Sequence, residues 1–122
     1  MIDRLRISAA GKNQLISLKR KTGIEHYNVL CRYALCLSLA NPSSPPNENY
    51  NYSGGIDIDW RTLTGGNEAL YTNLLLLRIS NDNVLINEEG LRQILASHIH
   101  RGLSYLSSRN DRDLLLGLAG KF

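Results

Sequence analysis

The sequence lacks the two kinds of segment that would place the chain outside the cytoplasm. No apolar run approaches the roughly 20 residues that cross a bilayer, because Arg78 closes the run Leu74–Leu77. The N-terminus also lacks the apolar stretch of a signal peptide, since Asp3, Arg4 and Arg6 interrupt it. We therefore expect a cytoplasmic protein without a membrane partner.

Cysteine is scarce as well, and this excludes a disulfide framework. The chain has only Cys31 and Cys36, five residues apart on a predicted helix. At that spacing the two side chains point about 140° apart, so they cannot pair with each other there. We interpret both as buried thiols that behave as small apolar residues. With 43% hydrophobic residues the chain can build one modest core without a disulfide.

Residues for catalysis or metal binding are few. His98 falls within the apolar stripe of a predicted helix and is interpreted as a core histidine, whereas His100 lies on another face and His26 in a turn. Asp57 and Asp59 share one strand face and could bind a divalent ion, but no further carboxylate lies near them, so we interpret this face as solvated. We predict no catalytic residue, no metal and no cofactor, and hence no enzyme.

The charge that is present is unevenly distributed along the chain. The total is only +3, yet residues 1–34 hold seven Lys and Arg against two Asp and Glu, while the remaining 88 residues hold seven bases and nine acids. A basic end on a slightly acidic body is typical of a protein whose one face meets a polyanion. A merely solvated basic face is the alternative.

Hydrophobic periodicity predicts a mainly α fold. We expect a ribbon-helix-helix-like N-terminal unit of strand, helix and helix, then a short strand and three further helices. The whole chain, 1–122, forms a single domain. The predicted strands span 4–8 and 56–60, the helices span 9–22, 28–40, 67–80, 88–107 and 111–118, and a mobile loop spans about 41–55. Asn28 and Asn87 are the expected N-caps of their helices.

The predicted helix 28–40 is apolar in nearly every direction, with Arg32 and Ser38 as the interruptions. Such a helix must be buried all round, and a 122-residue chain offers little material to wrap it. Self-association is the simplest way to cover it, so we expect an oligomer.

The predicted first helix carries cations at helical spacing. Lys12, Ile16, Lys19 and Arg20 stand at i, i+4, i+7 and i+8, which places three cations on one stripe roughly 100° wide. Arg4 and Arg6 alternate with apolar residues on the preceding strand and share its polar face. Cations arranged in this way suit a row of phosphates. Arg4 and Arg6 could also enter a major groove as a two-stranded ribbon does, although arginine serves phosphate equally well.

The N-terminal part of the chain resembles a known family. The resemblance rests on Arg-Leu-Arg-Ile-Ser at 4–8, Gln-Leu-Ile-Ser-Leu-Lys-Arg-Lys-Thr-Gly-Ile at 14–24, and the stretch from Tyr27 to Pro46, and it continues more loosely through Ile58–Thr62 and Gly102–Leu106. These segments are similar to the DndE family, the small subunit of the Dnd DNA sulfur-modification (phosphorothioation) system.

The resemblance implies a non-catalytic subunit that acts with other Dnd subunits. It also implies a homotetramer that binds duplex DNA, preferentially at nicks, through surface cations. The matching basic positions are Lys12, Lys19, Arg20 and Lys21. Two alternatives stay open: a ribbon-helix-helix repressor that reads a specific sequence, and an oligomeric scaffold for other modification subunits. About 80 residues beyond the second predicted helix favour the sulfur-modification family over the repressor.

Overall fold

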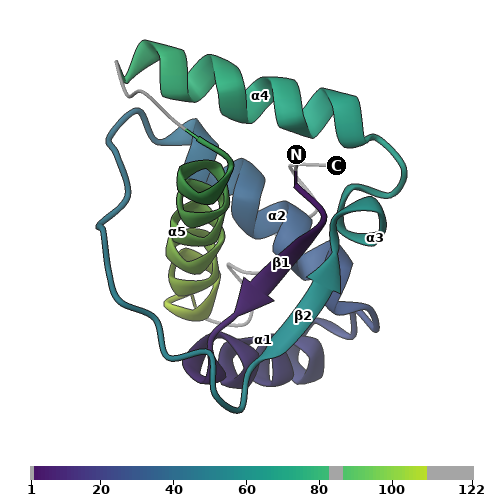
Figure 1. Ribbon diagram of the computed structural model, residues 1–122. Coiled ribbons are helices and arrows are strands. Elements are labelled where there is room, and N and C mark those ends of the chain that lie inside the picture. Colours follow the sequence, from purple (N-terminus) through teal and green to yellow (C-terminus); the bar gives the residue numbers. More distant parts are fainter. Residues whose placement is uncertain (1, 83–86, 110–122) are drawn as a thin grey trace.

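Five helices and a two-stranded ribbon make up the described part of the chain (Figure 1). A computed structural model describes residues 2–82 and 87–109. In chain order the elements are β1 (Arg4–Ile7), α1 (Ala9–Thr22), α2 (Tyr27–Ala40), β2 (Ile56–Asp59), α3 (Trp60–Thr64), α4 (Glu68–Asn81) and α5 (Glu88–Ser107). The mainly α prediction and the initial strand-helix-helix order are confirmed. The helix predicted over 111–118 lies outside the described residues.

Two predicted element boundaries are wrong. Trp60 does not continue the second strand but opens the short helix α3, because the Asp59 side chain caps that helix by accepting a hydrogen bond from the Thr62 N–H at 3.2 Å. The side chain of Trp60 is nevertheless buried, as its place in the alternation predicted. Helix α2 begins at Tyr27 with His26 as its N-cap, two residues before the predicted cap Asn28.

The two strands pair within the chain. β1 and β2 run antiparallel, with Leu5 opposite Ile58 and Arg6 opposite Asp57. The alternation places Leu5 and Ile7 in the core and leaves Arg4 and Arg6 exposed. The ribbon is therefore formed within one chain, with its apolar face on the helices.

Helix α2 lies in the interior and is crossed by α5 (Figure 1). Gly102 makes that crossing possible, because a Cβ at this position would lie 1.9 Å from the Ala34 carbonyl oxygen. Helices α1, α3 and α5 of the same chain all contact α2, and only Ala40 of α2 is exposed. The long helix α5 supplies much of the cover for α2, but Val29, Tyr33 and Cys36 on one side of the helix stay partly exposed, so self-association stays a prediction.

Helix α4 is covered on one side only. Thr72, Leu75 and Ile79 are buried, and the indole N–H of Trp60 donates to the Thr72 hydroxyl at 3.3 Å. The side chains on the opposite face are exposed: Leu70 by 55%, Leu74 by 39%, Leu77 by 60%. The apolar face predicted for this helix is thus divided between the core and the surface.

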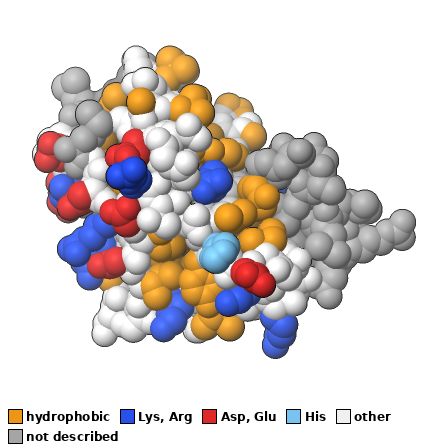
Figure 2. Space-filling view, turned by 90° about the vertical axis from the view of Figure 1, so that its right-hand side faces the viewer, with side chains coloured by type: hydrophobic (Ala, Val, Ile, Leu, Met, Phe, Trp, Pro, Cys, Tyr) orange, Lys and Arg blue, Asp and Glu red, His pale blue; other side chains and the backbone are white. Residues whose placement is uncertain are grey.

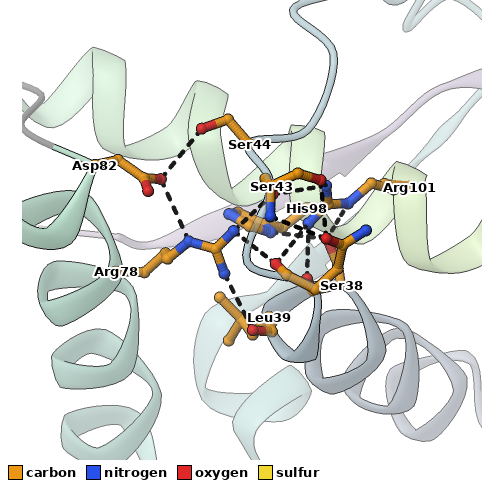
Figure 3. A network of polar contacts seen from close by, with 9 residues as sticks. Ser38, Leu39, Ser43, Ser44, Arg78, Asp82, His98 and Arg101 are labelled. Atoms are coloured by element: carbon orange, nitrogen blue, oxygen red, sulfur yellow. Dashed lines mark hydrogen bonds and ion pairs between the residues drawn. The ribbon is translucent and has the colours of Figure 1, made fainter.

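Two arginines bind the end of α2 and the start of the segment 41–55, which we call the strap (Figure 3). The Arg78 guanidinium donates to the carbonyls of Leu39, Asn41 and Ser43 at 2.6–3.0 Å. The Arg101 guanidinium donates to the Ser38 hydroxyl and carbonyl and to the Ser43 carbonyl at 2.7–2.8 Å. These carbonyls include orphan acceptors at the C-terminus of α2, where positive charge is favourable.

The same network contains His98, which is buried, as the sequence predicted. Its Nδ1 lies 2.8 Å from the Ser38 hydroxyl, which also accepts from Arg101. Among the described residues Nδ1 has this one partner, whereas the buried Nε2 has none. Burial of the ring, and next the nearby guanidiniums of Arg78 and Arg101, lower the pKa of His98 to about 4.

The rest of the strap runs along α5 and returns to β2 (Figure 1). The Tyr50 ring stacks on His100 with ring centres 4.0 Å apart, and the Asn51 carbonyl accepts from the Ala9 N–H at 3.1 Å. The Arg6 guanidinium lies 4.8 Å from the centre of the Tyr52 ring. The strap therefore has contacts along its length, and its mobility stays a prediction.

Candidate nucleic-acid interface

Helix α1 carries the basic residues on the side that faces away from the core. Gly11, Leu15 and Leu18 are buried and define the inner face of the helix. The outer face is defined by Ile16, which is 48% exposed on the predicted cationic stripe. The amphipathic pattern therefore turns the polar residues of α1 outward, as the sequence predicted.

Three of the four cations on this helix are exposed, namely Lys19, Arg20 and Lys21, and Lys12 is partly exposed. None of them forms an ion pair with a carboxylate of residues 2–82 or 87–109. Viewed down the axis, Lys19 lies about 20°, Arg20 about 80° and Lys21 about 180° from Lys12. The cations therefore spread over the outer surface of α1, wider than a single stripe.

The C-terminal end of α1 stabilises this positive charge. Gly23 closes the helix in the left-handed region, with φ of 74°, and its N–H donates to the Lys19 carbonyl at 2.9 Å. Lys19, Arg20 and Lys21 occupy the last turn, where the helix dipole stabilises positive charge. The Lys19 ammonium also lies 5.7 Å from the centre of the Tyr27 ring.

The start of α1 is attached to α5 through a histidine that sequence reasoning did not single out as functional. The Ser8 N–H donates to His100 Nε2 at 3.1 Å, and His100 Nδ1 lies 2.7 Å from the Ala96 carbonyl, to which it donates. The ring is thus neutral, and its burial lowers the pKa of His100. Ser8 also caps α1 by accepting from the Gly11 N–H at 3.0 Å. Residues 92 positions apart give no local signal of such a contact.

The structure separates Arg4 and Arg6 from the cations of α1 in electrostatic terms. Asp57 on the neighbouring strand forms long ion pairs with both, at 3.5 Å to Arg4 and 3.7 Å to Arg6. The strand face that they share also carries Asp59, which is opposite Arg4. This face is close to neutral. The sequence could not reveal it without the register that brings β2 beside β1.

Figure 2 shows one side of the molecule, on which Lys and Arg side chains are scattered and do not form one continuous patch. On this side of the molecule, charges of both signs mix toward the left edge, while apolar side chains are exposed from the top through the middle. Within the described ranges, no three His, Cys, Asp or Glu side chains gather in a way that could hold a metal ion. None of the described helices has the length and apolar character to cross a membrane.

These features define a small, mainly helical protein with a basic surface helix. The chain matches the family described as DNA sulphur modification protein DndE over residues 4–113, and it therefore belongs to the DndE family. The resemblance seen in the sequence is confirmed. Membership gives the chain a role in DNA sulfur modification.

The solved structures that match include the crystal structure of DndE from Escherichia coli B7A, which is involved in DNA phosphorothioation modification. The two chains are 23% identical, and the match covers 87% of this chain and 97% of that chain with a TM-score of 0.72. At this identity the likeness shows that the fold is shared. No curated protein matches the chain.

Proposed function

We propose that this chain is a non-catalytic, cytoplasmic subunit of the DNA phosphorothioation machinery that binds the backbone of duplex DNA, preferentially at nicked sites. It acts as a homo-oligomer, a tetramer, together with other Dnd subunits. The observation that carries the proposal is the set of cations on α1, which no described carboxylate neutralises, in a member of a DNA sulfur-modification family.

Phosphate binding follows from the arrangement of α1. Its side chains are long and flexible, but the helix that carries them is held at both ends, by His100 at Ser8 and by the Gly23 cap. Each phosphate that a cation neutralises releases condensed counterions, so affinity falls steeply with salt. The contacts we propose are Lys12, Lys19, Arg20 and Lys21, with a smaller contribution from Arg4 and Arg6 because Asp57 competes for them.

Self-association is supported most strongly by the outer face of α4. Leu70, Leu74 and Leu77 form an exposed apolar row, spaced so that they share one face of the helix. Glu68 and Arg78 are the charged residues of this helix. A row of leucines with few charges around it gains free energy when a second copy covers it.

The decisive experiment is a gel-shift series at two salt concentrations with the triple variant Lys12→Glu, Lys19→Glu and Arg20→Glu. We expect binding to be lost while light scattering shows an unchanged oligomer. For the single changes, Arg20→Glu should weaken binding and lower the slope of log affinity against log salt by about 1 or more. Arg61→Glu, which reverses an exposed charge on α3, is the matched control and should have little effect.

The same series tests the preference for nicks. Intact, nicked and random duplexes of equal length should differ little by sequence, whereas the nicked duplex should bind more tightly. Equal affinity for nicked and intact DNA contradicts the nick preference. Discrimination of about 4–10 kcal/mol between one operator and random DNA supports the repressor alternative. Full function of the triple variant supports the scaffold.

A further inference from the structure

Strand β1 has one edge without a partner strand, and the hydrogen-bond pattern shows which groups it presents. The Trp60 N–H donates to the Asp3 carbonyl at 3.0 Å, so Asp3 and Trp60 are a hydrogen-bonded pair of the antiparallel ladder. Because such pairs alternate, Leu5 also points its backbone groups at β2, and Arg4 and Arg6 point theirs away. The Ser8 N–H confirms this direction, since it reaches His100 on α5.

This edge opens into a cleft of about 590 Å³ between β1, the strap and α5. Asp3, Arg4, Leu5 and Arg6 form one wall in succession. The Arg4 N–H is taken by the Asp3 carboxylate at 2.9 Å. No described residue bonds the Arg6 N–H or the carbonyls of Arg4 and Arg6. An accessible donor flanked by two acceptors, at strand spacing, is what another extended backbone recognises.

The side chains beside this edge determine the charge of a fitting partner. The side chains of Arg4 and Arg6 are 60% and 55% exposed, and both depend on a single carboxylate, that of Asp57, at 3.5 Å or more. Although Asp57 and Asp59 make this strand face close to neutral overall, both ion pairs are long, and both guanidiniums are exposed enough to take a further carboxylate. On the other edge β1 already accepts β2, whose sequence Ile-Asp-Ile-Asp places acids beside the arginines and apolar residues beside the core.

The opposite wall of the cleft, formed by α5 and the strap, further restricts the charge of a fitting partner. Arg92 contributes positive charge, but it is engaged by Asp3 at 3.8 Å and by Glu89 at 3.6 Å. Glu48 and Glu89 also line the cleft. A uniformly acidic chain would meet repulsion there, whereas acids restricted to alternate positions next to β1 would not.

We propose that the free edge of β1 binds an extended segment of a partner protein in which two acidic residues alternate with apolar ones, added as a third strand of the ribbon. The acids lie beside Arg4 and Arg6, on the face that carries Asp57 on the other side. The apolar residues turn toward Leu5 and Ala96. The inference does not rest on DNA binding, although it uses Arg4 and Arg6, the two minor contacts of the proposed DNA surface.

The test uses a fluorescein-labelled probe peptide, Thr-Val-Asp-Val-Asp-Val-Thr, titrated with the full chain and followed by fluorescence anisotropy. Saturable binding is expected. A peptide of the same composition with adjacent aspartates should bind at least about tenfold more weakly, because only one acid can then face an arginine. An all-aspartate core should also bind more weakly. If either control binds equally well, attraction by charge alone explains the result and the proposal is overturned.

Two protein variants separate the contribution of the Arg6 backbone N–H to binding from that of the Arg6 side chain. Arg6→Ala keeps the N–H and should lower the affinity for the probe a few-fold. Arg6→Pro removes the N–H that points into the cleft, leaves the ladder with β2 intact, and should abolish binding, since proline is tolerated at a strand edge. Circular dichroism checks the fold. An N-methyl group on the probe amide next to either aspartate tests the same hydrogen bonds without altering the protein.

Two results overturn the proposal. One is equal binding of the probe to Arg6→Pro and Arg6→Ala together with equal binding of the N-methylated peptides. The other is a loss of oligomer mass by light scattering in Arg6→Pro but not in Arg6→Ala, which would assign the edge to a second copy of this chain.

Discussion

Helices α2 and α4 have the same length, 14 residues each, and both are rich in leucine, yet the chain treats them in opposite ways. Helix α2 is enclosed by α1, α3 and α5, and its C-terminal carbonyls receive two arginines. Helix α4 buries a narrow row of side chains and leaves three leucines exposed on the far face. Leucine content alone therefore does not tell which helix is the centre of a domain and which is its surface.

The difference follows from what lies beside each helix. The 20-residue helix α5 crosses α2 closely because Gly102 permits backbone contact. No such partner lies against the outer face of α4 in the described part of the chain. The comparison makes a clear division: changes in α2 and its neighbours should unfold the chain, whereas changes on the outer face of α4 should alter assembly.

The largest effect is expected for Gly102→Ala. The new Cβ would lie 1.9 Å from the Ala34 carbonyl oxygen, which is backbone and cannot swing aside. We expect a loss of more than about 4 kcal/mol in the free energy of unfolding, above the usual cost of overpacking. Urea unfolding measures it, with the exposed Ser104→Ala on the same helix as control. A Gly102→Ala chain as stable as the control would show that α2 and α5 do not cross this closely.

The next effect contrasts one leucine from each helix. Leu35 is fully buried on α2, so Leu35→Ala should cost about 3 kcal/mol through lost burial and the cavity left behind. Leu77→Ala on α4 removes the same atoms from a side chain that is 60% exposed and should cost less than about 0.5 kcal/mol in a dissociated chain. Equal costs from thermal or urea unfolding would remove the distinction between the helices.

Acid should destabilise the packing around the C-terminal end of α2, where His98 contacts Ser38. In the folded chain, burial lowers the pKa of His98 to about 4, below the ordinary value of 6.5. The unfolded chain takes up the proton first, so this stabilisation is fully present above pH 6.5 and is lost as the pH falls toward 4. Allowing for partial solvent screening, we expect a loss of roughly 2 kcal/mol. His100 acts in the same direction.

Urea midpoints measured between pH 4 and pH 7 test this prediction. His98→Gln keeps a polar side chain that does not titrate, so its midpoints should fall less over the same range. Equal slopes for the two proteins would exclude His98 as the source of the acid sensitivity.

The smallest effect on stability is expected on the outer face of α4. Changes there are followed by the mass of the oligomer. Replacing Leu70, Leu74 and Leu77 together by asparagine should leave the far-ultraviolet spectrum unchanged and reduce the oligomer to smaller species by light scattering. The exposed polar residue Asn73 of the same helix provides the control as Asn73→Ala. An unchanged mass in the triple variant would place self-association on another surface.

Much of the fold could be predicted because local rules applied. The alternation at 4–8, the Gly23 cap and the capping residue Asn87 each predicted an element that the structure contains. The candidate site was predictable in part. The register of α1 shows which cations face outward, whereas the neutralisation of Arg4 and Arg6 depends on a strand some 50 residues away.

The sequence by itself determined the helical periodicity, the caps and the concentration of positive charge near the N-terminus, because these depend on neighbours within a few positions. Only the tertiary structure decided which leucine-rich helix is enclosed, which arginines are neutralised, and that β1 keeps an open edge. These properties depend on contacts between residues far apart in the chain, and a close approach such as Gly102 against Ala34 is set by the packing of whole helices.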